Sequence, residues 1–154
     1  ENIAIQAIDM NSVDESRMQS AIKDASLTNE IESFPDGLET RVGERGVTLS
    51  GGQRQRTALA RLFYRDFNAI LLDDVMSAVD HATETKLIDA VYRRVDTTRL
   101  IVSHRTSVLA RADKIIVLDQ GKVTDEGTHE ALIERPGPYQ QAYELQRDST
   151  GATA

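Results

Sequence analysis

Two short apolar runs, each followed by a segment with helical spacing, constrain the fold of this chain more than any other feature. Residues 69–72 run directly into Asp73 and Asp74, and residues 100–102 end close to His104. Continuous apolar runs of this length are typical of strands that are buried on both faces of a parallel sheet. Because strands and helices alternate along the sequence, we predict an α/β fold with a mostly parallel sheet and flanking helices.

The other elements follow from caps, turn residues and helical periodicity. Ser12 and Glu15 have the spacing of a capping box, which predicts that a first helix begins there. Further helices are expected over 28–34, from about residue 51, over 83–94 and over 107–111. A Gln120–Gly121 turn predicts a β-hairpin over 114–127, followed by two short helices. Residues 148–154 are expected to be disordered.

Composition narrows the classes of function. The length of 154 residues suits one domain, and the net charge of −7 is a poor footprint for nucleic acid or for anionic lipid. There is no cysteine, which excludes disulfides, zinc-thiolate sites and cysteine nucleophiles. No apolar run approaches the roughly 20 residues of a membrane-spanning helix. The first residue is Glu1 and no cap or turn opens the sequence, so we expect the chain to be cut from a longer one.

A glycine pair at the start of a predicted helix is the first candidate binding site. Gly51 and Gly52 allow close approach of a ligand, and the helix N-terminus favours an anion. Ser50 and Gln53 add side chains that can form hydrogen bonds. The alternative is structural, with Ser50 as a helix cap and the glycines as its entry loop.

The paired aspartates and the histidine are the second and third candidates. Side chains at the carboxyl ends of parallel strands face the crevice where α/β proteins bind ligands. Asp73 and Asp74 could there hold Mg²⁺ and orient a water molecule, and His104 could reach a phosphate. The alternatives are aspartates that only cap the next loop and a histidine with a structural role.

Together these motifs resemble the nucleotide-binding domain of ABC transporters over nearly the whole chain. "LSGGQRQRTALARLF" (49–63) is similar to the signature motif and its helix, and "AILLDD" (69–74) to the Walker B strand. "SAVD" (77–80) is similar to the D-loop, and "IVSHR" (101–105) to the switch-histidine loop. "TRVGERG" (40–46) resembles the exporter loop that contacts the coupling helices of the membrane domain.

The resemblance implies a partial P-loop NTPase fold of the ABC ATPase type, together with part of its helical signature subdomain. Residues 1–147 would form this part of the domain. Within them, 1–65 would be the signature subdomain, and 66–147 would hold the Walker B, D-loop and switch motifs and the C-terminal hairpin and helices.

The resemblance also assigns roles to individual residues. Asp73 would hold Mg²⁺ through water, and Asp74 and His104 would act at the γ-phosphate of ATP. Ser77 and Asp80 would belong to the D-loop. The signature residues would complete the ATP site of a second ABC ATPase domain in a head-to-tail dimer; they are Ser50, Gly51, Gly52 and Gln53.

Two departures from the family pattern qualify this activity. No P-loop of the form G-x-x-x-x-G-K-[ST] occurs in the 154 residues, so the fragment alone is expected to be inactive. The P-loop strand normally lies in the middle of the sheet, so we also expect a marginal, self-associating or rearranged fragment. Asp74 stands where the family usually has Glu, and its shorter side chain predicts slow hydrolysis at that site.

The implied function is part of the ATPase subunit of an ABC exporter, at the cytoplasmic face of a membrane. Its partners would be the second ATPase domain and the transporter's transmembrane domain, and its ligands ATP and Mg²⁺. No nucleic acid is expected to bind. The alternative is a truncated, non-catalytic module that engages an ABC ATPase partner through its signature surface.

Overall fold

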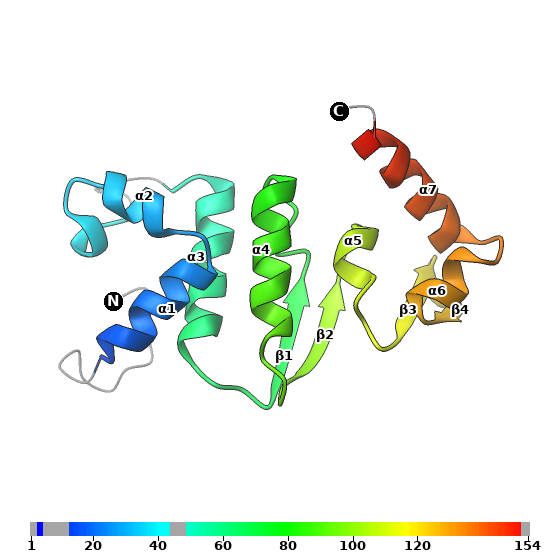
Figure 1. The fold of residues 1–154 in the computed structure, drawn as a ribbon, viewed down its shortest axis with the longest axis horizontal. Coiled ribbons are helices and arrows are strands. Elements are labelled where there is room, and N and C mark those ends of the chain that lie inside the picture. Colours follow the sequence, from blue (N-terminus) through cyan, green and yellow to red (C-terminus); the bar gives the residue numbers. More distant parts are fainter. Residues whose placement is uncertain (1–2, 5–12, 44–48, 152–154) are drawn as a thin grey trace. The chain divides into compact units, whose positions relative to one another are not determined.

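The structure is a computed structural model that describes residues 3–4, 13–43 and 49–151 (Figure 1). The chain divides into a first compact unit that ends at Leu100 and a second that begins at Ile101. The first unit contains α1 (Glu15–Asp24), α2 (Thr28–Ser33), the 3₁₀ turn η2 (Gly37–Glu39), α3 (Gly51–Tyr64), β1 (Ala69–Asp73), α4 (His81–Tyr92) and most of β2 (Thr98–Val102). The second contains α5 (Thr106–Leu109), β3 (Ile115–Asp119), β4 (Lys122–Gly127), α6 (His129–Ile133) and α7 (Pro138–Gly151). The division after residue 65 stays a prediction.

Helix α1 packs against α3 and begins at a different cap from the one expected. Ser12 lies outside the described residues, and the N-cap is Asp14, whose carboxylate accepts from the Arg17 N–H at 3.0 Å. The capping box from Ser12 to Glu15 is therefore wrong. Aspartate is as good an N-cap as serine, so the helix can start directly after Asp14. The Asp14 N–H donates in turn to the Tyr64 hydroxyl at 3.0 Å, which joins the two helices.

Strands β1 and β2 are neighbours in a two-stranded sheet, and their arrows run in the same direction in Figure 1. The Thr98 N–H donates to the Asn68 carbonyl at 2.9 Å where the two strands begin. The Arg99 guanidinium of β2 donates to carbonyls at the end of α4, including that of Val91 at 3.3 Å. This strand–helix–strand arrangement confirms the α/β class and the parallel pairing.

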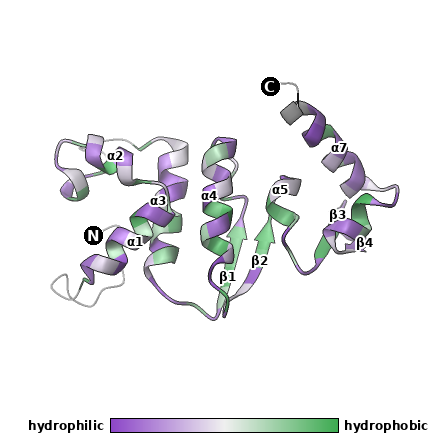
Figure 2. Cartoon of the chain, in the orientation of Figure 1, coloured by the Kyte–Doolittle hydropathy of each residue, from purple (hydrophilic) through white to green (hydrophobic). Residues whose placement is uncertain are grey.

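The strands are not buried on both faces, contrary to the prediction. Ile70 and Leu72 of β1 are buried, but the alternating residue Leu71 is 67% exposed. In β2 no residue is buried, and Leu100 and Val102 are 61% and 51% exposed. In the described part of the chain, α4 joins the two strands, and most of the ribbon of both strands is coloured as hydrophobic in Figure 2. The prediction failed because an apolar run shows what a strand can bury and not what covers it.

The exposed face of this sheet predicts self-association of the chain when it is studied alone. Exposed apolar side chains and an unpaired strand edge favour contacts with a second copy. We expect size-exclusion chromatography with light scattering to show oligomers, and the double variant Leu71→Lys/Leu100→Lys to shift the chain toward monomer. Leu145→Lys is the control, because Leu145 is equally exposed but lies on α7. A wild-type monomer with a cooperative melt would contradict this prediction.

The second unit is built on the predicted hairpin. Strands β3 and β4 pair antiparallel, and Gln120 and Gly121 turn the chain with φ values of 47° and 75°. Ile115, Leu132 and Tyr139 form its buried cluster. The Tyr139 hydroxyl lies 2.9 Å from His129 Nδ1, and burial raises the pKa of Tyr139 to about 12.

The other boundaries agree with the predictions to within a few residues, except at the C-terminal end. Helix α2 and the hairpin lie where they were expected. Helix α4 begins two residues early, because Asp80 and not a later residue is its cap. The last helix, α7, continues to Gly151, so the segment expected to be disordered from residue 148 begins within a helix. None of the helices in the described ranges is long and apolar enough to cross a bilayer.

Candidate functional site

The start of α3 is closed by a reciprocal pair of hydrogen bonds between two of the predicted site residues. The Gln53 N–H donates to Ser50 Oγ at 3.2 Å, and the Ser50 N–H donates to Gln53 Oε1 at 2.9 Å. This is the capping box that the structural alternative required. It leaves Gly51 and Gly52 as the first two residues of the helix, whose N–H groups have no acceptor within the helix. Ser50 and Gly51 are exposed, so an anion can reach this end of α3.

Gly52 has a second constraint, which is internal to the chain. A Cβ placed on this residue would lie 2.7 Å from the Ala78 carbonyl oxygen, a distance that real Cβ atoms do not reach. On Gly51 the nearest atom to such a Cβ is the Ala78 Cβ, at 3.9 Å. Glycine at position 52 therefore allows the start of α3 to approach the backbone of residue 78, in addition to any approach of a ligand.

The paired aspartates lie at the carboxyl end of β1, as predicted, but their surroundings differ. Asp73 is exposed, whereas Asp74 is partly buried and has φ = 47°. This left-handed conformation is uncommon for residues other than glycine, and Asp is one of the types that tolerate it. The Asp74 carbonyl accepts from the Ser77 N–H at 3.3 Å and from Ser77 Oγ at 2.9 Å, which closes a tight turn after the strand.

Asp80 has a clear structural role as the N-cap of α4. Its carboxylate accepts from the Thr83 N–H at 3.0 Å and from the Thr83 hydroxyl at 2.7 Å. These hydrogen bonds, led by the one from the backbone N–H, lower the pKa of Asp80. The side chain is thus held as a carboxylate at the end of the turn that begins at Asp74. This helix start explains why "SAVD" is followed directly by α4.

His104 follows β2 in the second unit, and its side chain is exposed. The backbone around it is held by Gln146 of α7, a residue that the sequence did not single out. The Gln146 amide donates to the His104 carbonyl at 2.8 Å and accepts from the Thr106 N–H at 2.9 Å. Nothing in the local sequence around position 146 indicates this long-range contact. The position of His104 beside the aspartates stays a prediction.

Gln55 is a second residue that sequence reasoning missed. Its side-chain amide lies on α3, one turn after the glycines, and forms hydrogen bonds with Ser77 and Ala78. The structure therefore brings the Gly51–Gly52 start of α3 next to residues 77 and 78 of the first unit. In the sequence, Gln55 appears only as a second glutamine after "LSGGQ" (49–53). Because a surface glutamine on a helix has no preferred partner, this position did not predict the contact.

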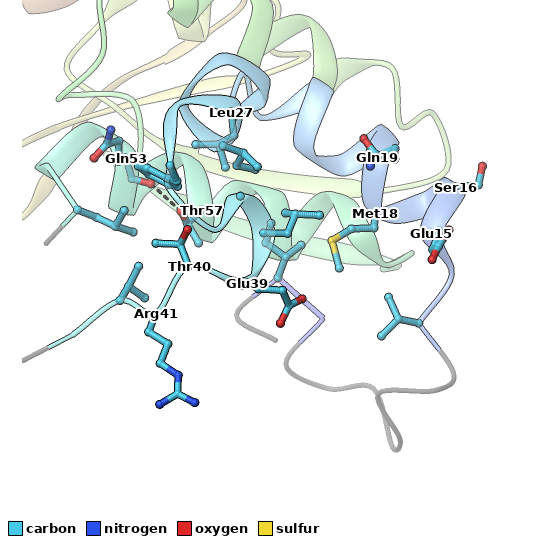
Figure 3. Close-up of a pocket in the computed structure, with 18 residues that line it drawn as sticks. Glu15, Ser16, Met18, Gln19, Leu27, Glu39, Thr40, Arg41, Gln53 and Thr57 are labelled. Atoms are coloured by element: carbon cyan, nitrogen blue, oxygen red, sulfur yellow. Dashed lines mark hydrogen bonds between the residues drawn. The ribbon is translucent and has the colours of Figure 1, made fainter. Parts of the chain in front are cut away.

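An open pocket of ≈ 1240 Å³ lies among α1, α2, η2 and the start of α3 (Figure 3). Thr57 and Gln53 of α3 border it together with Met18 of α1, and the Arg41 side chain extends away from these residues. Thr40 Oγ1, also on the lining, is buried and has no hydrogen-bond partner among the residues that the structure describes. Thr40, Arg41 and Val42 are the described residues of the "TRVGERG" segment that line the pocket.

Asp73, the candidate metal ligand, does not belong to a preformed cage of metal-binding side chains in the described ranges. In the ranges 3–4, 13–43 and 49–151, no three histidine, aspartate or glutamate side chains converge as a metal cage. Mg²⁺ bound to nucleotide phosphates needs only one or two protein carboxylates and keeps several waters. The exposed carboxylate of Asp73 at the strand end fits that kind of site. When bound to the nucleotide phosphates, such an ion would supply positive charge that offsets theirs.

Comparison with known proteins finds similarity to ABC transporters. A family profile described as ABC transporter matches residues 2–77. An "ATP-dependent lipid A-core flippase" of Ralstonia nicotianae is 38% identical over 94% of this chain and 25% of its own length. An "ABC-type transporter fsqE" of Aspergillus fumigatus is 45% identical over 89% of the chain and 11% of its own length.

A solved structure agrees with these sequence comparisons. The structure of a bacterial Atm1-family ABC exporter with ATP bound superposes with a TM-score of 0.84 and 34% identity. The superposition covers 95% of this chain and 25% of that one. The chain thus spans about a quarter of the length of the flippases and the exporter that it matches.

Proposed function

This chain belongs to the ABC transporter family and has a partial ABC ATPase fold, and on that premise we propose that it is part of the ATP-hydrolysing subunit of an exporter. In this role, ATP binding closes a dimer of ATPase domains and hydrolysis opens it again. The cycle drives a transmembrane domain from the cytoplasmic side. The observation that carries the proposal is the capped "LSGGQ" turn at an exposed helix start, in a chain that superposes closely on an ATP-bound exporter.

The signature residues Ser50 to Gln53 would serve the nucleotide of a partner domain. Several features support this assignment: the turn is exposed, it begins a helix of 14 residues, and it has two N–H groups without an acceptor in the helix. The dipole of α3 adds partial positive charge at the same place. A terminal phosphate brought by a partner domain is the kind of group that such a helix start binds.

The site that contains Asp73 and Asp74 would bind Mg²⁺ and ATP but hydrolyse it slowly, and His104 keeps the γ-phosphate role that the resemblance implies as a separate prediction. Phosphoryl transfer depends on positioning and on charge around the γ-phosphate, so a displaced carboxylate lowers the rate. Asp74 is shorter than glutamate by one methylene, and its carboxylate stays closer to the backbone. With a misplacement of ~1 Å, the rate can fall about 100-fold.

The pocket bordered by Thr40 to Val42 is the surface that we assign to the transmembrane domain. It combines apolar side chains with charged ones and contains the unpaired hydroxyl of Thr40, which a partner's polar group could satisfy. The segment that begins at Thr40 resembles the exporter loop at this interface. Coupling between ATP hydrolysis and transport would pass through this contact.

The test compares the 154-residue chain with the full-length parent protein in lipid vesicles. We expect Mg²⁺-dependent ATP turnover from the parent and none from the chain alone, because no P-loop lysine is present in the 154 residues. The measurement is phosphate release, repeated after stringent repurification. Turnover by the chain alone would overturn the requirement for an upstream P-loop.

A mixing experiment separates this proposal from a non-catalytic role. The chain is added to an intact ABC ATPase partner domain, and the partner's turnover is measured with increasing amounts of chain. A parent that hydrolyses ATP supports the ATPase assignment. A parent without turnover, together with a chain that stimulates or inhibits the partner, would instead identify a binding module.

A further inference from the structure

The side chain of Gln55 joins two segments that lie more than twenty residues apart in the sequence. Its Nε2 donates to Ser77 Oγ at 3.2 Å, and its Oε1 accepts from the Ala78 N–H at 3.2 Å. One planar amide therefore forms hydrogen bonds with two consecutive residues of the turn between β1 and α4. Gln55 is partly buried, whereas Ser77 and Ala78 are exposed, so both hydrogen bonds lie at the surface.

Close packing accompanies these two hydrogen bonds. Gly52, at the first turn of α3, lies so near the Ala78 carbonyl that a Cβ there would be only 2.7 Å away. Ser77 is connected in turn to the backbone of Asp74, through a 2.9 Å bond from its hydroxyl to the Asp74 carbonyl. A continuous set of contacts thus runs from the signature turn through Gln55 and Ser77 to the backbone of Asp74.

We propose that Gln55 is a positioning residue that couples the signature turn to the Asp74–Ser77 turn. The inference rests on the proposed function, in which Ser50 to Gln53 engage the partner's nucleotide. Binding of that nucleotide restricts movement at the start of α3. Through its two hydrogen bonds, Gln55 then also restricts movement of the turn that contains Asp74. Each ATP site would then influence the geometry of the other through residues of one chain.

The contacts at position 55 need one donor, for Ser77 Oγ, and one acceptor, for the Ala78 N–H, and a side-chain amide supplies both. Gln55 donates with one atom and accepts with the other, whereas methionine of similar length cannot donate and its sulfur accepts only weakly. Glutamate has two acceptor oxygens and no donor, so it can keep the hydrogen bond from the Ala78 N–H but cannot donate to Ser77 Oγ, whose single proton goes to the Asp74 carbonyl. Gln55→Met therefore breaks the link, whereas Gln55→Glu keeps only the hydrogen bond to Ala78.

The experiment is hydrogen–deuterium exchange on the intact parent protein, with and without a non-hydrolysable ATP analogue and Mg²⁺. In the wild type we expect the analogue to slow exchange over residues 75–80. In Gln55→Met this nucleotide-dependent slowing should be lost, and exchange without nucleotide should be about fivefold faster. We expect kcat for ATP to fall about tenfold with KM nearly unchanged, because the loss is one of positioning. Gln55→Glu, which keeps the hydrogen bond from the Ala78 N–H, should fall between Gln55→Met and the wild type in both measurements.

A matched control is Gln141→Met, which makes the same change at an exposed position of α7. It should leave exchange over 75–80 and the turnover unchanged. The proposal would be overturned if Gln55→Met exchanged over residues 75–80 at the wild-type rate and was slowed by the analogue as in the wild type. It would also be overturned if exchange without nucleotide were faster but the analogue still slowed it fully. If the wild-type parent hydrolyses no ATP, the proposed function fails. The nucleotide-free exchange of Gln55→Met then still decides whether Gln55 holds the turn.

Discussion

Replacing Ser50 by arginine is expected to lower ATP turnover about 100-fold or more at the site that the signature turn completes. The substitution puts bulk and positive charge at the exposed start of α3, where the terminal phosphate of the partner's nucleotide would lie. It also removes the hydroxyl that accepts the Gln53 N–H. The measurement is phosphate release by a dimer. One half is the full-length parent that carries Ser50→Arg, and the other half is an unmodified partner domain.

Ser50→Ala separates the loss of the cap from the steric and charge effects. Both substitutions remove the same N-cap, at a cost of about 1 kcal/mol in the free energy of unfolding. They should therefore have similar melting temperatures, while only Ser50→Arg should abolish turnover at that site. Normal turnover in the Ser50→Arg dimer would rule out the assignment of this turn to the partner's nucleotide.

Asp74→Glu in the full-length parent is expected to raise ATP hydrolysis at its own site by about 10- to 100-fold. The added methylene would bring the carboxylate to the distance at which the family's usual glutamate acts. The backbone opposes the change to a small extent, because φ at position 74 is 47°, a conformation that aspartate tolerates better than glutamate. We expect the free energy of unfolding to fall by at most about 1 kcal/mol.

Asp74→Asn is the matched variant for this position. Asparagine has the length of aspartate and also tolerates the left-handed region, but it has no charge. The residual hydrolysis should therefore fall while the melting temperature stays close to that of the wild type. Unchanged or lower turnover in Asp74→Glu would show that the length of the side chain does not limit the rate.

The sequence alone was sufficient to predict elements whose signals are local. Ser50 followed by two glycines and Gln53 predicted the start of α3, and the structure shows the capping box there. Gln120 and Gly121 predicted the hairpin turn, and both have positive φ values. Cap residues and turn glycines act on their immediate neighbours, so a short window of sequence contains all the information needed.

Features that depend on distant residues could not be predicted in this way. The apolar run of β1 indicated a strand, but the exposure of Leu71 depends on which elements cover the sheet. The contacts of Gln55 with Ala78 and of Gln146 with His104 bridge long separations along the chain. A surface glutamine has many possible partners, and only the folded chain selects one.

Because Gln146 on α7 is hydrogen-bonded to the His104 carbonyl, movement of the loop around His104 can be observed from the last helix. Leu145 is the neighbour of Gln146 on α7 and is 73% exposed, and the 154 residues contain no cysteine. A single cysteine at position 145 would therefore carry a fluorescent label without a competing thiol in this chain. Light emitted from α7 would then report on movement of the backbone at His104, with the histidine itself unmodified.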